Sequence, residues 1–200
     1  MGIIFVDFYG VIIKFIGNSY SSPQLAFFRN FFALIPIILL LIITRDIKNI
    51  FVGISKKFLF LCFLRGISFV LMQIFYYISI INMNFATATT LTFSSPIFIV
   101  VLSMLVLKEK IGLFRWSAIF IGFGGVLLIM NPTSELFSYI SILPLFAALC
   151  WAISNIVLKF IPEDISSVKI NFYSINFSYI GSLIILFSTS DFSPIENSFD

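Results

Sequence analysis

The run from Phe85 to Leu107 constrains the fold more than any other feature, because it is 23 residues long and contains no charged side chain. At about 1.5 Å of rise per residue, a helix of this length spans the hydrocarbon core of a bilayer, which is roughly 30 Å thick. A short charged patch, Lys108 to Arg115, follows, and Trp116 to Met130 is apolar again. Two apolar runs joined by a short charged turn are typical of a transmembrane hairpin.

The composition excludes a water-soluble domain. Hydrophobic residues make up 60% of the chain and charged residues 10%, whereas soluble domains carry about 25% charged residues. A chain of 200 residues with this polarity predicts an all-α integral membrane protein with several transmembrane helices. The net charge of +3 is too small to indicate nucleic acid as a partner.

The apolar runs predict about seven spans, of which the first is short for a bilayer. They cover residues 2–17, 25–43, 58–81, 85–107, 116–130, 139–160 and 170–188. Basic residues gather in alternate turns, namely Arg45, Lys48, Lys56, Lys57, Lys108, Lys110, Arg115, Lys159 and Lys169. Because basic turns face the cytoplasm, we expect a cytoplasmic N-terminus and a multi-pass protein of the bacterial inner membrane.

A repeat relates the two parts of the chain. Sliding the sequence by 145 residues places Lys14-Phe15-Ile16 on Lys159-Phe160-Ile161 and Ser21-Ser22 on Ser166-Ser167. Five expected spans separate the two copies, and because five is an odd number the copies must be inverted in the membrane. Inverted repeats are typical of secondary transporters.

The repeat predicts two parts of unequal length. We expect a first five-span repeat in residues 1–132 and, in residues 133–200, the first two spans and a tail of a second repeat. A full second copy would extend to about residue 276, which is residue 131 shifted by 145 positions. The chain is therefore expected to be either a short protein in its own right or a piece of a ten-span carrier.

The side chains on which most enzymes depend are scarce. The chain has no histidine, which excludes histidine bases and most catalytic zinc sites. Cys62 and Cys150 lie in apolar spans and are expected to be buried thiols. Asp7 is the only acid inside an expected span. We therefore expect no enzyme, no cofactor and no metal site.

The most specific family likeness lies between Phe85 and Pro132. It rests on Ala86, Ala88, Pro96, Glu109 and the glycine-rich fifth span. In order and spacing the chain resembles the EamA-type drug/metabolite transporters, ten-span carriers with two five-span repeats. The run LAFFRNFFA, residues 25–33, is similar to members described as S-adenosylmethionine uptake transporters. The resemblance implies alternating access around a small metabolite held near the bilayer midplane.

Three charged residues are candidates for direct contact with a ligand or an ion. Arg65 and Arg29 are candidate anchors for an anionic group such as a carboxylate, because charges inside a membrane are costly and usually face a cavity or a partner. The alternative is that each arginine extends to the nearer interface. Asp7 is a candidate coupling carboxylate or ion-pair partner of Arg65, and the alternative is that it lies at the interface.

Uncharged residues complete the expected binding site. Pro96 removes a backbone donor and frees a carbonyl, so the break formed by Ser94, Ser95 and Pro96 is the best candidate for substrate contact. Other candidates for a midplane pocket are Gln73, Tyr76, Tyr77, Trp151 and Asn155, although Tyr and Trp also gather at membrane interfaces. Glu109 lies in a tight basic turn, where it is expected to fix a turn or gate.

These observations predict an inner-membrane carrier that moves a small metabolite by alternating access. S-adenosylmethionine or an amino-acid-like compound is the expected cargo implied by the resemblance. The alternative is a truncated, non-transporting remnant or a half-carrier that needs another polypeptide. The expected partners are the lipid bilayer and the metabolite, with a homo-oligomer left open and no nucleic acid.

Overall fold

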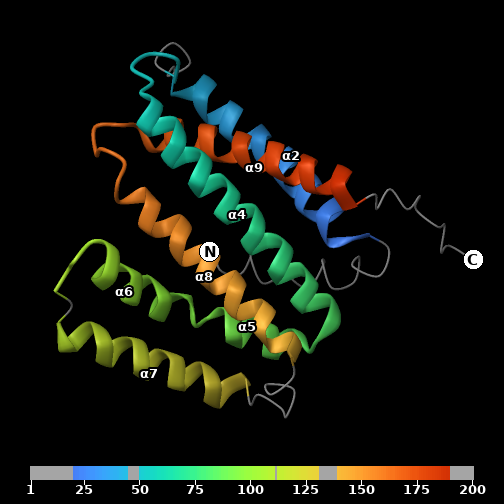
Figure 1. The fold of residues 1–200 in the computed structure, drawn as a ribbon, viewed down its shortest axis with the longest axis vertical. Coiled ribbons are helices and arrows are strands. Elements are labelled where there is room, and N and C mark those ends of the chain that lie inside the picture. The colour runs from blue at the N-terminus through green and yellow to red at the C-terminus, as the bar shows by residue number, and fades with distance from the viewer. Residues whose placement is uncertain (1–19, 45–49, 111, 131–138, 190–200) are drawn as a thin grey trace, which may run out of the picture.

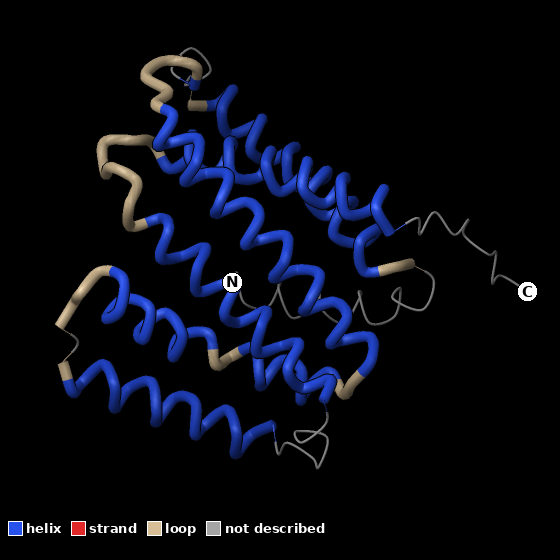
Figure 2. Tube along the Cα trace, viewed as in Figure 1, coloured by secondary structure: helices blue, strands red, loops and turns tan. Residues whose placement is uncertain are grey.

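The computed structural model describes residues 20–44, 50–110, 112–130 and 139–189. This part of the chain is helical and contains no strand (Figure 2), which confirms the expected all-α class. The helices in chain order (Figure 1) are α2 Ser22–Ile43, α4 Lys56–Asn82, α5 Phe85–Thr92, α6 Ser95–Val106, α7 Leu113–Met130, α8 Ile142–Leu158 and α9 Ser167–Thr189. A 3-10 turn, Tyr139–Ser141, leads into α8.

Five segments of the described part are long and apolar enough to cross a membrane. They are Ser22–Ile43, Lys56–Asn82, Phe85–Val106, Tyr139–Leu158 and Ser167–Thr189. The fifth expected span falls in α7, where the apolar stretch Leu113–Gly125 is shorter, and the first expected span lies outside the described residues. Large apolar side chains such as Phe32 and Phe120 are exposed on the outside of the bundle, as expected of helices that face lipid.

Polar caps place the helix starts two to three residues before the apolar runs. The Ser55 hydroxyl accepts a hydrogen bond from the Phe58 N–H at 3.0 Å and caps α4. At the start of α2, the Ser21 N–H donates to Gln24 Oε1 at 3.0 Å, one half of a capping box. Because the capping residues and the first helical residues are polar, hydropathy alone predicts a later start for both α2 and α4.

The fourth expected span is divided into two helices at Phe93 and Ser94. Pro96 has no N–H to donate to the carbonyl of Thr92, four residues earlier, so the helical ladder is interrupted. The Ser94 hydroxyl instead donates to the Leu91 carbonyl at 2.6 Å. A break at this proline, inferred from the sequence, is present.

Helix α4 is the centre of the bundle. It packs against α8 on one side and against α9 and α2 on another, while α8 also contacts α5 and α6 (Figure 1). The contact between α4 and α9 is very close at Gly66, where a side-chain carbon would lie 2.6 Å from the Ser174 carbonyl oxygen. The Ser178 hydroxyl donates to the Gly66 carbonyl at 2.8 Å across the same contact. Small residues let helix backbones approach in this way.

The loops after α2, α6 and α8 lie at the same end of the bundle (Figure 2). Among the described residues these loops contain Lys108, Lys110 and Lys159, and the helices that follow them carry Lys56, Lys57, Arg115 and Lys169 near their starts. Lys159 and Glu109 form an ion pair at 2.8 Å, which joins the end of α8 to the turn after α6. Lys169 Nζ donates to the Val52 carbonyl at 2.6 Å and joins the start of α9 to the loop before α4. We refer to this end as the basic end.

Candidate functional site

A cavity of about 360 Å³ lies between α2, α4, the junction of α5 and α6, and α8. Its residues on α4 run from the midpoint of that helix towards Asn82, so the cavity is near mid-depth in the bundle. The lining residues are Arg29, Phe69, Met72, Gln73, Tyr76, Tyr77, Thr89, Thr92, Phe93, Ser95 and Trp151. One side chain of this set is cationic, five are aromatic and none is acidic.

Three residues from three helices form a row along the cavity. The Arg29 guanidinium of α2 lies 4.7 Å from the ring centroid of Phe69 on α4. That ring lies 5.7 Å, centroid to centroid, from Trp151 on α8. In the described part of the chain, no carboxylate is within ion-pair distance of Arg29. The cation is therefore held by an aromatic face and keeps its hydrogen-bond donors for another group.

Gln73 lines the cavity, but its amide is already bonded to Asn30. Its Oε1 accepts from Asn30 Nδ2 and its Nε2 donates to Asn30 Oδ1, each at 3.1 Å. Asn30 is 0% exposed and Gln73 2% exposed, so the two bonds satisfy amides that are cut off from solvent. This pair fixes α2 against α4 next to Arg29, and Gln73 is thus a positioning residue.

The helix break supplies polar groups to the cavity. Thr92, Phe93 and Ser95 line it. The Thr92 carbonyl lacks its helical hydrogen bond, because Pro96, four residues later, has no N–H to donate. The hydroxyls of Thr89 and Thr92 donate to carbonyls of their own helix and so present their lone pairs outwards. This wall of the cavity can therefore accept hydrogen bonds, whereas Arg29 opposite can donate them.

The structure brings together six of the residues expected at the binding site, namely Arg29, Gln73, Tyr76, Tyr77, Ser95 and Trp151. Ser94, Pro96, Arg65 and Asn155 are not among the residues that line the cavity. The Asn155 amide donates to the Trp151 carbonyl of its own helix at 2.8 Å, and Arg65 Nη1 donates to Asn171 Oδ1 of α9 at 3.0 Å. Asp7 lies outside the described residues.

Sequence reasoning missed two kinds of residue at this site. Phe69 and Phe93 could not be distinguished from the other phenylalanines, because the chain contains 27 of them. Asn30 could have been found, since an amide inside the apolar run LAFFRNFFA needs a partner. Glu109, expected at a turn or gate, forms the ion pair with Lys159 described above, and both side chains are partly exposed.

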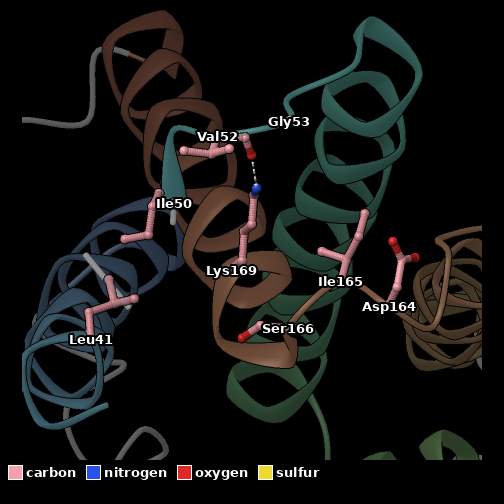
Figure 3. Close-up of a pocket in the computed structure, with 8 residues that line it drawn as sticks. All are labelled: Leu41, Ile50, Val52, Gly53, Asp164, Ile165, Ser166 and Lys169. Atoms are coloured by element: carbon pink, nitrogen blue, oxygen red, sulfur yellow. Dashed lines mark hydrogen bonds between the residues drawn. The ribbon is translucent and has the colours of Figure 1, made fainter. Parts of the chain in front are cut away.

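A second cavity, of about 400 Å³, lies at the basic end (Figure 3). Its wall includes Leu41 of α2, the loop residues Ile50, Val52 and Gly53, and Lys169 of α9. Lys169 already donates to Val52 there, and Asp164 lies in the same lining. This cavity is lined by helix ends and loops, whereas the first is lined mainly by the faces of helices.

Comparison with known proteins gives a consistent set of relatives. Residues 1–131 match the model of the EamA-like transporter family. The chain is 31% identical to an S-adenosylmethionine uptake transporter of Rickettsia bellii over 166 residues, 82% of this chain and 55% of the relative. It is 30% identical to the protein of the same name from Rickettsia conorii, over 86% of this chain and 57% of the relative.

A shorter match relates the chain to a riboflavin transporter of Vibrio cholerae, with 39% identity over 34% of this chain and 23% of the relative. The chain spans about half the length of the S-adenosylmethionine relatives that it matches. No solved structure matches. The family and these relatives are named as transporters and not as enzymes, in agreement with the expectation from the sequence.

Proposed function

Because the chain belongs to the EamA-like transporter family, we propose that it forms the substrate-binding part of a membrane carrier for a small metabolite. The observation that carries this proposal is the mid-depth cavity between α2, α4, α5, α6 and α8. A site near the bilayer midplane, next to a broken helix, is what alternating access requires, because the ligand must be reachable from either side in turn. The protein is a multi-pass membrane protein, and we place its N-terminus in the cytoplasm from the charge bias of its loops.

An inverted repeat is part of the proposal, with residues 1–132 as the first copy and 133–200 as the start of the second. Helix α9 begins at Ser167, which is 145 residues after Ser22, where α2 begins. The two helices pack antiparallel. The ring centroid of Phe27, near the start of α2, lies 5.4 Å from that of Tyr179, in the second half of α9. Leu41, near the end of α2, packs near Phe172, in the first half of α9. Both the matching starts and the opposite directions support this assignment.

S-adenosylmethionine is the cargo that we propose, ahead of other amino-acid-like compounds. Its carboxylate fits the planar donors of Arg29, since guanidinium and carboxylate form paired charge-assisted hydrogen bonds. Its adenine and its sulfonium cation suit the aromatic wall that includes Phe69, Tyr76 and Trp151, because rings stack on such faces and attract cations. A wall without an acid leaves the cationic end of the ligand to these rings.

The cavity contains its own reporter, because the chain has two tryptophans and only Trp151 lines the cavity. A Trp116→Phe variant in nanodiscs should therefore show a saturable change in Trp151 emission when S-adenosylmethionine is titrated. Adding Arg29→Gln should weaken binding at least about tenfold, because a hydrogen bond to a charged group contributes roughly 1.5–3 kcal/mol. Measuring emission against ligand concentration gives both dissociation constants.

Two controls make this titration specific. Trp151→Phe, which leaves Trp116 on α7, should give no emission change, and Arg115→Gln removes a cation outside the cavity and should leave the affinity unchanged. Riboflavin is the competitor to include. The assignment of this cavity would be wrong if S-adenosylmethionine left the Trp151 emission unaltered at millimolar concentration.

A further inference from the structure

Arg65 of α4, like Arg29 of α2, is an arginine inside a membrane-spanning helix that has no carboxylate partner in the described part of the chain. It lies one helical turn from Phe69 on α4, on the side of the basic end, because α4 begins there at Lys56. We infer that Arg65 is a second carboxylate-binding residue, which receives the anionic group of the ligand as it passes between the cavity and the basic end. This inference rests on the proposed function.

Among the described residues, no carboxylate compensates the charge of Arg65. Its Nη1 donates to Asn171 Oδ1 at 3.0 Å, but its Nε is buried and has no hydrogen-bond partner in the described residues. A neutral amide does not offset a guanidinium inside a membrane, where charges normally face a partner or a pathway. The group that matches its unused donors is a carboxylate.

The position of Arg65 suits a passage from the cavity. Residues 65, 69 and 73 of α4 recur every fourth position and share one face of the helix. Phe69 carries the Arg29 guanidinium on its ring, and Gln73 lines the cavity on the next turn. One turn of helix is about 5.4 Å, so Arg65 lies about that much nearer to the basic end than Phe69, whose ring carries the Arg29 guanidinium. The alternative is an arginine that only extends to the interface.

The test separates binding from movement. Purified protein in liposomes is compared with Arg65→Gln for uptake of radiolabelled S-adenosylmethionine, and the Trp151 titration is repeated on the same variant. We expect the maximal uptake rate to fall at least tenfold while the dissociation constant stays within twofold. The unchanged titration also shows that the variant is folded. Arg65→Lys keeps the charge but not the planar guanidinium, so its maximal uptake rate should lie between those of the Arg65→Gln and unmodified proteins.

The carboxylate itself is tested with 5′-methylthioadenosine, which has a similar nucleoside and no carboxylate. This compound should move at the same rate through the Arg65→Gln and unmodified proteins. An equal loss for both compounds, an unchanged uptake rate, or a weakened Trp151 titration would each overturn the role of Arg65. The role would also be overturned if Asp7→Asn lowered the uptake rate as much as Arg65→Gln does and the double variant lowered it no further. In that case the carboxylate that Arg65 binds would be the side chain of Asp7 and not a group of the ligand. If the unmodified protein neither binds nor carries the ligand, it is the proposed function that fails.

Discussion

Replacing Gly66 with alanine should lower the stability of the protein by about 1–3 kcal/mol, the usual cost of forcing atoms into a filled contact. The new methyl group would lie 2.6 Å from the Ser174 carbonyl oxygen and 2.8 Å from the Phe177 Cβ. Neither is the flexible end of a side chain, so α4 and α9 must move apart. That movement also stretches the hydrogen bond from Ser178 to the Gly66 carbonyl. Thermal unfolding in detergent, followed by circular dichroism, measures the loss.

The matched control is Gly122→Ala, because an added carbon at Gly122 in α7 meets nothing within 4 Å. Alanine has the higher helix propensity by about 1 kcal/mol, so this variant should be neutral or slightly more stable. Equal destabilisation of both variants, or no effect at Gly66, would contradict the close contact between α4 and α9.

The second large effect is expected at the amide pair of the cavity. Gln73→Leu leaves the Asn30 amide buried without its two partners, and an unsatisfied buried group costs about 1–3 kcal/mol. Double-mutant cycles on hydrogen bonds between transmembrane helices have given smaller energies, at most about 1.7 kcal/mol. We therefore expect Gln73→Leu to lower the free energy of unfolding by about 1–2 kcal/mol. Unfolding of Gln73→Leu, Asn30→Leu and the double variant provides the measurement.

The double variant decides between the two explanations of such a loss. If the pair acts as a unit, replacing both amides should recover part of the stability lost in each single variant. Asn155→Leu is the control, because that amide donates only to the Trp151 carbonyl of its own helix and should lose less than 1 kcal/mol. Simple addition of the two single losses would mean that Asn30 and Gln73 do not act together.

The helices could be predicted from the sequence, since uncharged runs such as Phe85 to Leu107 are long enough to cross a bilayer and Pro96 interrupts the helical ladder. The sides on which these helices contact one another could not be predicted. A membrane helix is apolar on all sides, so its sequence does not say which side meets a neighbour. For this reason both Arg29 and Asn155 were candidates for the binding site, although only Arg29 lines the cavity.

Partners across helices were also beyond the sequence. Gln73 was expected at the substrate, but its position is set by Asn30, which is 43 residues away in the chain. Arg65 donates to Asn171 of α9, a partner 106 residues away that the sequence did not indicate, while Asp7, a candidate partner, lies outside the described residues. Such contacts depend on how α2, α4 and α9 rotate about their axes, and packing at Gly66 and Ser178 fixes that rotation.

The central claim is that this chain carries a metabolite through the cavity that contains Arg29 and Trp151. The most direct measurement is uptake of radiolabelled S-adenosylmethionine into liposomes that contain the purified protein, with Arg29→Gln and protein-free liposomes alongside. The account predicts saturable uptake that falls at least tenfold in Arg29→Gln. Uptake no greater than in protein-free liposomes, from a protein whose Trp151 emission still responds to the ligand, would contradict the claim that the chain is a carrier.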